Sequence, residues 1–491
     1  MKTVQYATLA LEKIVGGGQT LGTLDDGRRA FVWGGLPGEI VTIRITKKKS
    51  HFVEGIVTEV ISASSKRIEP IDPDSYLSTS PWQIITFESE QHYKAALIEE
   101  AFELHDIVLP QQIEVYTDKR TAHYRNKVEF SWFSNSPLAS SEADTLDLAF
   151  FQRGSKGKIT IDQCSLLPEP MMTLALAMRD LLRTKSVTAR NLKTLLIRCD
   201  QQGGCIWQLY LKDKLASVIS ADEANSLPAL GGELIYSDPR SPASRITERL
   251  ARFGETTLTD TILDVPFRYA TEGFFQVNIP LYKQALRDIR KFITLNPSEV
   301  GSISKTSAQT RGEGEPDALQ SEDCLSEVSS TAPNSAGETS SRRAEAVLDN
   351  EVYRIVDFYS GVGSIGLTIG GDNCTLVEID EHAVREMKEN IKALGSKAKA
   401  VLSASEKALE HITGNEIVIV DPPRAGLHKD VVDRLLETRP PRIIYLSCNP
   451  VTQARDVALL AEKYGIRAHR GYNFFPRTPH IEHLVVLDLK Q

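Results

Sequence analysis

The sequence contains little cysteine, and its cysteines are not paired along the chain. Six cysteines are dispersed over 491 residues, and no two of them form a CxxC motif. This spacing argues against a disulfide framework and against a cysteine-based zinc site. We therefore expect a protein of the reducing cytoplasm, with no metal site of this kind.

Long hydrophobic runs are also absent. No apolar stretch approaches the length that would span a bilayer, and the first residues lack the core of a signal peptide. The hydrophobic fraction of 41% and the charged fraction of 25% are those of an ordinary globular protein. A chain of this length predicts about two or three domains, and we expect a monomer without contact to a membrane.

An excess of positive charge is missing as well, because the net charge is −8. Residues 301–350 carry nine acidic and only four basic side chains, so this segment accounts for most of the imbalance. Local basic clusters remain, among them Lys47, Lys48 and Lys49. The total charge therefore does not exclude a nucleic acid as partner.

Residues 8–62 alternate between apolar and polar side chains in short runs that are separated by glycine-rich turns. This pattern predicts a small five-stranded β-barrel of the OB-like kind, within a domain over residues 1–64. Such barrels often bind nucleic acid through basic and aromatic side chains. The candidates here are Arg28, Arg29, Lys47, Lys48, Lys49 and Phe52, although a solvated charged edge explains any one of them equally well.

Residues 65–270 mix strand-like and helical runs, which predicts a central α+β domain without a catalytic motif of its own. Residues 281–293 have the apolar spacing of a helix. Residues 299–346 are rich in Ser, Glu, Gly and Thr and nearly free of aromatic side chains. Such a composition predicts a disordered insertion within a third domain, residues 271–491.

From residue 353 onward, short β-rich runs alternate with helical runs, which predicts a mainly parallel sheet with helices on both faces. In such Rossmann-like domains, ligands bind at the carboxyl ends of the strands. The run DFYSGVG (residues 357–363) is a strand followed by a glycine-containing turn, and Glu378 ends the next strand. Together they predict a site for a nucleoside-containing cofactor, with S-adenosylmethionine favoured over a dinucleotide.

Two further strand ends carry reactive groups. Asp421 and Arg424 belong to the rigid turn Asp-Pro-Pro-Arg, and Cys448 follows the strand RIIYL. A thiolate at such a position can attack an electron-poor ring carbon. His480 and Glu482 precede the last strand, where a carboxylate beside a nucleophilic cysteine is a candidate general base.

Together, GFFQVN (residues 273–278), DFYSGVG, VEID, DPPRAG, LSCNP and TPHIEHLVVL resemble the motifs of the RNA uracil-5-methyltransferase family, in that family's order. The barrel resembles the TRAM domain of its ribosomal-RNA members. The resemblance implies a Rossmann-like class I methyltransferase domain that uses S-adenosylmethionine, with RNA as the partner. It also implies that Cys448 adds to carbon 6 of uracil and that Glu482 removes the proton from carbon 5.

The resemblance assigns the cofactor to one set of side chains and the target base to another. The cofactor positions are Gln276, Tyr359, Ser364, Glu378 and Asp421, and the tentative substrate positions are Phe274 and Arg424. The chain departs from the family at Ser364, where Asn is usual, and near Ala404, where an acidic residue is expected.

A further departure concerns the [4Fe–4S] cluster that many family members hold through four cysteines. Asp72, Ser78 and Pro81 stand at three of those positions, and only Cys164 remains. One thiolate cannot hold such a cluster. We therefore expect no iron–sulfur cluster, and we expect Cys164 to be buried.

Other activities remain open from the sequence. A cytosine-5 RNA methyltransferase would also use a cysteine but gives Glu482 no obvious purpose, and an adenine-N6 enzyme needs an aromatic residue where Arg424 stands. A catalytically decayed RNA-binding factor would need neither Cys448 nor Glu482. The barrel favours 23S ribosomal RNA over transfer RNA as substrate, although the sequence does not identify the uridine.

Overall fold

The structure is a computed structural model that describes residues 4–134, 146–185, 187–294 and 354–490. The expected insertion at 299–346 and Cys324 lie outside these residues. Met1–Ile289 and Tyr353–Gln491 form one compact unit. Within the described residues, no helix combines the length and the apolar composition needed to cross a membrane.

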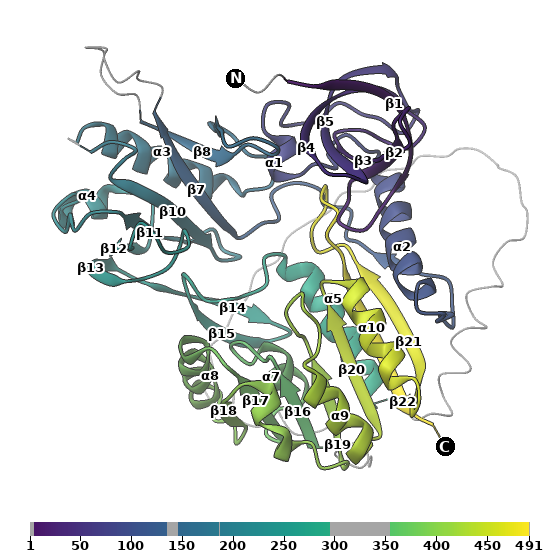
Figure 1. The fold of residues 1–491 in the computed structure, drawn as a ribbon. Helices are drawn as coiled ribbons and strands as arrows, with labels where there is room; N and C mark the ends of the chain where they lie inside the picture. Colours follow the sequence, from purple (N-terminus) through teal and green to yellow (C-terminus); the bar gives the residue numbers. More distant parts are fainter. Residues whose placement is uncertain (1–3, 135–145, 186, 295–353, 491) are drawn as a thin grey trace, which may run out of the picture. The chain divides into compact units, whose positions relative to one another are not determined.

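The first five strands close into a barrel (Figure 1, purple). They are β1 (Tyr6–Ile14), β2 (Thr20–Thr23), β3 (Arg29–Trp33), β4 (Ile40–Lys48) and β5 (Phe52–Ser62), in the order β1-β2-β3-β5-β4. Alternate residues point inward, so that Leu9, Leu11, Val41 and Ile43 pack in one core. The barrel predicted from the alternating pattern is confirmed.

A second sheet follows in the middle of the chain, in the order β13-β12-β11-β10-β7-β8-β9. Its strands are β7 (Lys127–Ser134), β8 (Leu146–Phe151), β9 (Lys158–Thr160), β10 (Leu192–Cys199), β11 (Cys205–Leu211), β12 (Gly231–Tyr236) and β13 (Glu248–Gly254). Helix α3 (Glu169–Arg183) packs Leu174 and Met178 against Phe130 and Trp207 of this sheet. The short helices α1 (Tyr76–Thr79) and α4 (Ala221–Ser226) and the hairpin β14 (Thr257–Ile262) with β15 (Val265–Ala270) complete this part.

The C-terminal sheet has the order β18-β17-β16-β19-β20-β22-β21-β6. Its strands are β16 (Arg354–Phe358), β17 (Cys374–Glu378), β18 (Lys399–Leu402), β19 (Glu416–Val420), β20 (Arg442–Ser447), β21 (Tyr464–Tyr472) and β22 (Glu482–Leu489), with β6 (Val115–Tyr116) at the edge. The helices are α5 (Ile279–Thr294), α7 (Ser364–Ile369), α8 (Glu381–Ala393), α9 (Lys429–Thr438) and α10 (Pro450–Leu460), with 3-10 turns η1 (Ser405–Lys407) and η2 (Leu409–His411). Strands β16 to β20 are parallel, as predicted, and β22 is antiparallel to β20.

Two elements from early in the chain belong to this C-terminal sheet. Strand β6 pairs in parallel with the end of β21, and helix α2 (Phe87–Glu103) buries Ile98 and Phe102 in the same core as the sheet. Figure 1 shows α2 beside β21. The sequence analysis did not place these elements here, and its domain boundaries at residues 64 and 270 stay predictions.

Candidate active site

The carboxyl ends of four parallel strands bring the predicted site residues to one edge of the sheet. Phe358, the last residue of β16, pairs with Val377 of β17 on one side and with Val420 of β19 on the other. Val420 in turn pairs with Tyr445 of β20. Tyr359, Asp421 and Cys448 follow strand ends, and Glu378 ends β17, so these four residues share one edge.

The turn after β16 is built for close approach to a ligand. Tyr359 and Gly361 have positive φ values of 63° and 55°, and Gly363 caps helix α7 at a φ of 87°. No described atom lies within 4 Å of the position that a Cβ on Gly361 would take. The unusual backbone conformation of Tyr359 is strained, which is typical of functional sites. The turn thus leaves open space at the strand end.

Glu378 ties the next strand end to this turn. One of its carboxylate oxygens accepts from the backbone N–H of Gly361 at 2.9 Å, and the other accepts from Ile379 at 2.8 Å and from Asp380 at 2.9 Å. These bonds fix the carboxylate in place. A carboxylate has about four acceptor positions, so it retains capacity for the hydroxyl groups of a ribose.

Ser364 and Tyr282 form a hydroxyl pair at the start of α7. The two side-chain oxygens lie 2.7 Å apart, and Tyr282 is buried on helix α5. Burial raises the pKa of Tyr282 well above its usual value, and the charges of Asp421 and Glu482 add to this effect. Tyr282 was missed from the sequence, because only its position shortly after GFFQVN distinguishes it from an ordinary helical core residue.

The GFFQVN segment is held from the central sheet. The Asn126 side chain donates to the Gln276 carbonyl at 3.0 Å, and the buried Arg198 donates to the Gly273 carbonyl at 2.8 Å. Phe275 stacks on Tyr269 with ring centroids 4.0 Å apart. By contrast, the neighbouring Phe274 is 68% exposed. The loop is therefore rigid where it carries Gln276 and offers an aromatic ring to solvent.

Cys448 and Glu482 are brought together by one antiparallel ladder. Ser447, the last residue of β20, pairs with His483 of β22, so the next residues outward are Cys448 and Glu482. Asn449 then caps helix α10. The Glu482 side chain is buried, whereas Cys448 is partly exposed. Both groups are therefore adjacent at the same edge of the sheet.

The electrostatics of this pair are unbalanced. Burial, together with repulsion from Asp421, raises the pKa of Glu482 well above its usual value. Desolvation raises the pKa of Asp421 to about 7. Burial and the charges of Glu482 and Asp421 raise the pKa of the Cys448 thiol to about 11, and Arg424 opposes this rise. Protons thus bind these groups more tightly than they bind exposed ones.

The Asp-Pro-Pro-Arg turn is fastened to the loop of Cys448. The Arg424 carbonyl accepts from the Asn449 side chain at 2.8 Å and from the Thr452 hydroxyl at 3.1 Å. Asp456 accepts from the backbone N–H of Leu427 at 2.8 Å. The turn and the nucleophile candidate therefore form one structural block.

Two segments of the chain match known family models. Residues 372–490 match the family model for tRNA (Uracil-5-)-methyltransferase, and residues 9–58 match the TRAM domain. The C-terminal part of the chain is therefore similar to the RNA uracil-5-methyltransferases, and the barrel is similar to a TRAM domain. The matched segment includes Glu378, Asp421, Cys448 and Glu482.

Similar proteins cover nearly the whole length. An uncharacterized RNA methyltransferase of Enterococcus faecalis is 25% identical, over 93% of this chain and 92% of its own. Another, from Gloeobacter violaceus, is 26% identical over 99% of this chain and 96% of its own. Among solved structures, the Pyrococcus abyssi tRNA (uracil-54, C5)-methyltransferase in complex with S-adenosyl-L-homocysteine has a TM-score of 0.69 at 18% identity, covering 97% of this chain and 99% of its own.

A hydrogen-bonded carboxylate stands at one of the positions where the resemblance led us to look for cluster cysteines. The buried Asp72 accepts from the Gln83 side chain at 2.8 Å and from the Ser165 hydroxyl at 2.5 Å, and Ser165 also donates its backbone N–H at 3.1 Å. Cys164 is buried, as expected, and burial raises its pKa to about 11. These groups do not fit a cluster that needs four thiolates.

Acidic neighbours partly neutralise the basic side chains of the barrel. Arg28 lies 2.5 Å from Asp26, and Arg29 lies 3.1 Å from Glu12. Lys47 pairs with Glu54 at 2.5 Å, and its ammonium lies 5.6 Å from the Phe52 ring. The predicted RNA-binding role of these side chains stays a prediction, as does that of Lys48 and Lys49.

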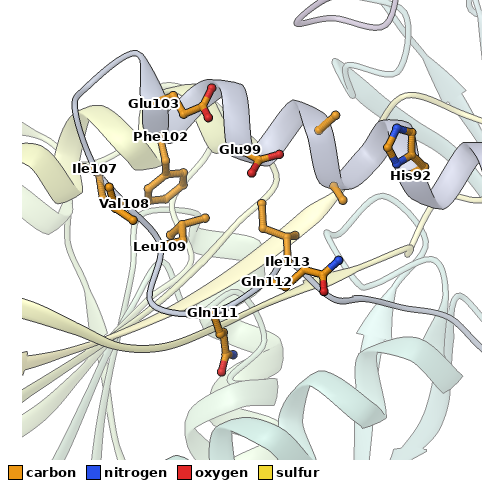
Figure 2. Close-up of a pocket in the computed structure, with 12 residues that line it drawn as sticks. His92, Glu99, Phe102, Glu103, Ile107, Val108, Leu109, Gln111, Gln112 and Ile113 are labelled. Carbon is orange, nitrogen blue, oxygen red and sulfur yellow. The ribbon is translucent and has the colours of Figure 1, made fainter. Parts of the chain in front are cut away.

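A cavity of about 290 Å³ lies outside this edge of the sheet, between helix α2 and the loop 107–113. Figure 2 shows Phe102, Leu109 and Ile113 lining it, with Glu99 and Glu103 on the helix. It contains none of the residues predicted from the family motifs. The candidate active site is therefore defined by strand ends and not by this cavity.

Proposed function

We propose that this protein methylates carbon 5 of a uridine in structured RNA, with S-adenosylmethionine as the methyl donor. The observation that carries the proposal is the placement of Cys448 beside Glu482 on one ladder, at the edge where the cofactor positions of the family also lie. A thiol and a carboxylate next to each other are the two groups that this reaction needs.

The residues at the strand ends fit S-adenosylmethionine. Glu378 is suited to the ribose hydroxyls, and the turn at Gly361 leaves room for the cofactor to approach the backbone. We assign the remaining contacts to Gln276, Tyr359, Ser364 and Asp421. Bound there, the cofactor supplies an electrophilic methyl group.

The two catalytic residues act in sequence. The Cys448 thiolate adds to carbon 6 of uracil, and the electrons of the 5,6 double bond move towards the carbonyl at carbon 4. Carbon 5 then forms a bond to the methyl group, whose bond to sulfur breaks. Glu482 removes the proton from carbon 5, the double bond re-forms, and Cys448 leaves as thiolate. The raised pKa of Glu482 suits it to accept a proton near neutral pH.

The target base must leave its stack to reach Cys448. Phe274 is exposed on the loop that carries Gln276, and we assign it to stacking on the RNA. Arg424 is the second tentative substrate contact. A ribosomal or transfer RNA substrate agrees with the cytoplasmic location expected from the sequence.

The choice between the two RNAs rests on the barrel. The barrel favoured 23S ribosomal RNA, and we keep that substrate as the proposal. However, the match to a transfer-RNA enzyme covers 97% of this chain. The uncovered 3% is too short to contain the barrel, so the matched region must include it. The presence of a barrel therefore does not separate the two substrates, and the experiment must offer both.

The test is methyl transfer from labelled S-adenosylmethionine to 23S ribosomal RNA and to transfer RNA transcribed in vitro, followed by nucleoside analysis. We expect label in 5-methyluridine, with 23S RNA as the preferred acceptor. Label in 5-methylcytidine would replace the proposal by a cytosine-5 activity. RNA binding without transfer to either RNA would favour the decayed binding factor.

A further inference from the structure

Arg424 contacts both His480 and the loop of the nucleophile candidate. Its Nη2 donates to Nδ1 of His480 at 3.0 Å, its carbonyl accepts from the Asn449 side chain at 2.8 Å, and its charge lowers the pKa of the Cys448 thiol. Since an arginine can only donate, Nδ1 of His480 must be the acceptor and the ring proton must reside on Nε2. Arg424 is therefore the donor and His480 the acceptor in this contact.

Both ends of this contact are fixed by the surrounding backbone. The Arg424 carbonyl is held from the Cys448 loop, as described above, and two prolines precede it. His480 donates its backbone N–H to the Thr478 hydroxyl at 3.3 Å, and its ring packs edge-on against Phe475. Arg424 therefore has a defined partner in His480.

The loop of His480 is anchored in turn by helix α2. The buried Lys94 donates to the Phe475 carbonyl at 3.1 Å and to the Asn473 side chain at 2.5 Å. The backbone N–H of Arg477 donates to the Glu90 carboxylate at 3.0 Å. These hydrogen bonds hold the segment that precedes His480 in place, and thereby hold His480 near Arg424.

The charges around the thiol explain why such a contact is needed. Cys448 faces Glu482 at the start of β22 and Asp421 at the end of β19, and Arg424 is the positive group that opposes them. Desolvation and the charges of Arg424, Lys94, Arg125 and Arg153 lower the pKa of His480, so its ring is neutral at pH 7. A neutral imidazole accepts a hydrogen bond from Arg424 and so orients its guanidinium. Because the imidazole carries no positive charge, it does not itself pair with the thiolate.

We propose that His480 is a positioning residue that holds the Arg424 guanidinium against Cys448 and so stabilises the thiolate before RNA binds. The inference rests on the proposed function, in which Cys448 is the nucleophile. It gives Arg424 a role in the free enzyme, in addition to any contact with the substrate. A guanidinium fixed beside a thiolate is a common means of increasing its population.

The test measures Cys448 alkylation by iodoacetamide in the full-length protein, without RNA, across pH 6 to 10. Peptide mass spectrometry follows the Cys448 peptide, and the other described cysteines are buried. Below the midpoint, the rate reports the thiolate fraction, so a midpoint that lies about half a pH unit higher makes alkylation about threefold slower. We expect alkylation to be about threefold slower in His480→Leu and about tenfold slower in Arg424→Leu.

Two further variants separate positioning from mere structure. His480→Asn places an acceptor oxygen close to the position of Nδ1, so it should restore most of the alkylation rate. His382 makes the same kind of contact with Arg385 on helix α8, and His382→Leu should leave the profile unchanged. Calorimetry with S-adenosylhomocysteine should give the same affinity for the wild type and the His480 variants.

An unchanged alkylation profile in folded His480→Leu would overturn the inference, even if RNA affinity fell. If that variant does not melt cooperatively, Arg424→Gln takes its place, and an unchanged profile there has the same meaning. The alkylation readout does not require turnover. Failure of the proposed function would instead show as methyl transfer by Cys448→Ala, whatever the alkylation profile.

Discussion

Two of the buried carboxylates, Asp72 and Glu482, have opposite surroundings. Asp72 accepts hydrogen bonds from Gln83 and Ser165, which are neutral donors aimed at it. Glu482 instead faces a second carboxylate, Asp421, and its pKa rises. The same chemical group thus stabilises a fold where donors satisfy it and becomes a strong base where another charge opposes it.

The surroundings of a buried carboxylate therefore indicate whether it is a structural or a reactive group. A satisfied carboxylate contributes through its hydrogen bonds, so its removal should appear in stability. A buried carboxylate that faces another carboxylate lowers stability but is a stronger base. Its replacement should therefore lower the turnover rate. Substitutions at the two carboxylates and at the neighbouring thiol should separate effects on stability from effects on turnover.

Replacing Cys448 by Ala should lower turnover by a factor of at least about 10³, because no other group forms the bond to carbon 6. Single-turnover methyl transfer measures the loss. Calorimetry with S-adenosylhomocysteine should show nearly unchanged binding, since the cofactor positions stay intact. Robust turnover by this variant would remove Cys448 from the mechanism.

Replacing Glu482 by Gln should lower turnover by about 10²-fold, because general-base catalysis typically contributes that much. Bond formation and methylation should still proceed, so a covalent protein–RNA adduct should accumulate. Denaturing gel electrophoresis detects it. Near-normal turnover without an adduct would mean that another group removes the proton.

The value of kcat/KM should rise about tenfold for each pH unit between pH 7 and 9, because Cys448 acts as a thiolate and burial raises the pKa of its thiol to about 11. Stability should run in the opposite direction. The pKa of Asp421 rises on folding from 3.8 to about 7, so its contribution favours folding below pH 4 and is lost as pH rises towards 7. Rate profiles and melts over the same buffers test both trends.

Replacing Asp72 by Ala should reduce the free energy of unfolding by about 1 to 3 kcal/mol, since it removes an acceptor from the buried Gln83 amide and from the partly buried Ser165. Its kcat should change little. Asp74→Ala is the matched control, because Asp74 is exposed two residues away. A normal melt with impaired catalysis would reverse the roles that we give to the two acidic regions.

The smallest expected effect concerns iron. Anaerobically purified protein should contain no stoichiometric iron and should lack the brown absorbance of a cluster, because Asp72, Ser78 and Pro81 replace thiolates. Metal analysis of the full-length protein measures this. About four irons per chain would show that the cysteine positions were misread.

Much of the fold was predictable because its signals are local. The alternation of apolar residues predicted the barrel, and strand ends followed by Gly, Pro or Cys predicted the edge that carries Tyr359, Asp421 and Cys448. Contacts between distant segments were not predictable. The two residues of β6 have no periodicity, and nothing near Asp72 indicates that Gln83 and Ser165 will surround it.

The candidate site shows the same limit. The motifs named Arg424 and His480, but their mutual contact depends on how two loops fold back over different strands. The pairing of Ser364 with Tyr282 depends on where helix α5 packs, and a tyrosine in a helix carries no signal for that. Sequence patterns thus named the candidate groups, whereas the side chains that surround them became known only from the structure.

The early placement of α2 and β6 in the last sheet has a consequence for how the polypeptide matures. Strand β21 ends its ladder on β6, and Ile98 and Phe102 of α2 cover the core beneath. A fragment of residues 271–491 alone would expose an unpaired strand edge and an uncovered apolar surface, the features that lead to aggregation. On the ribosome, α2 and β6 are made first and must remain available until the last strands emerge. We therefore expect residues 271–491 to fold completely only together with α2 and β6.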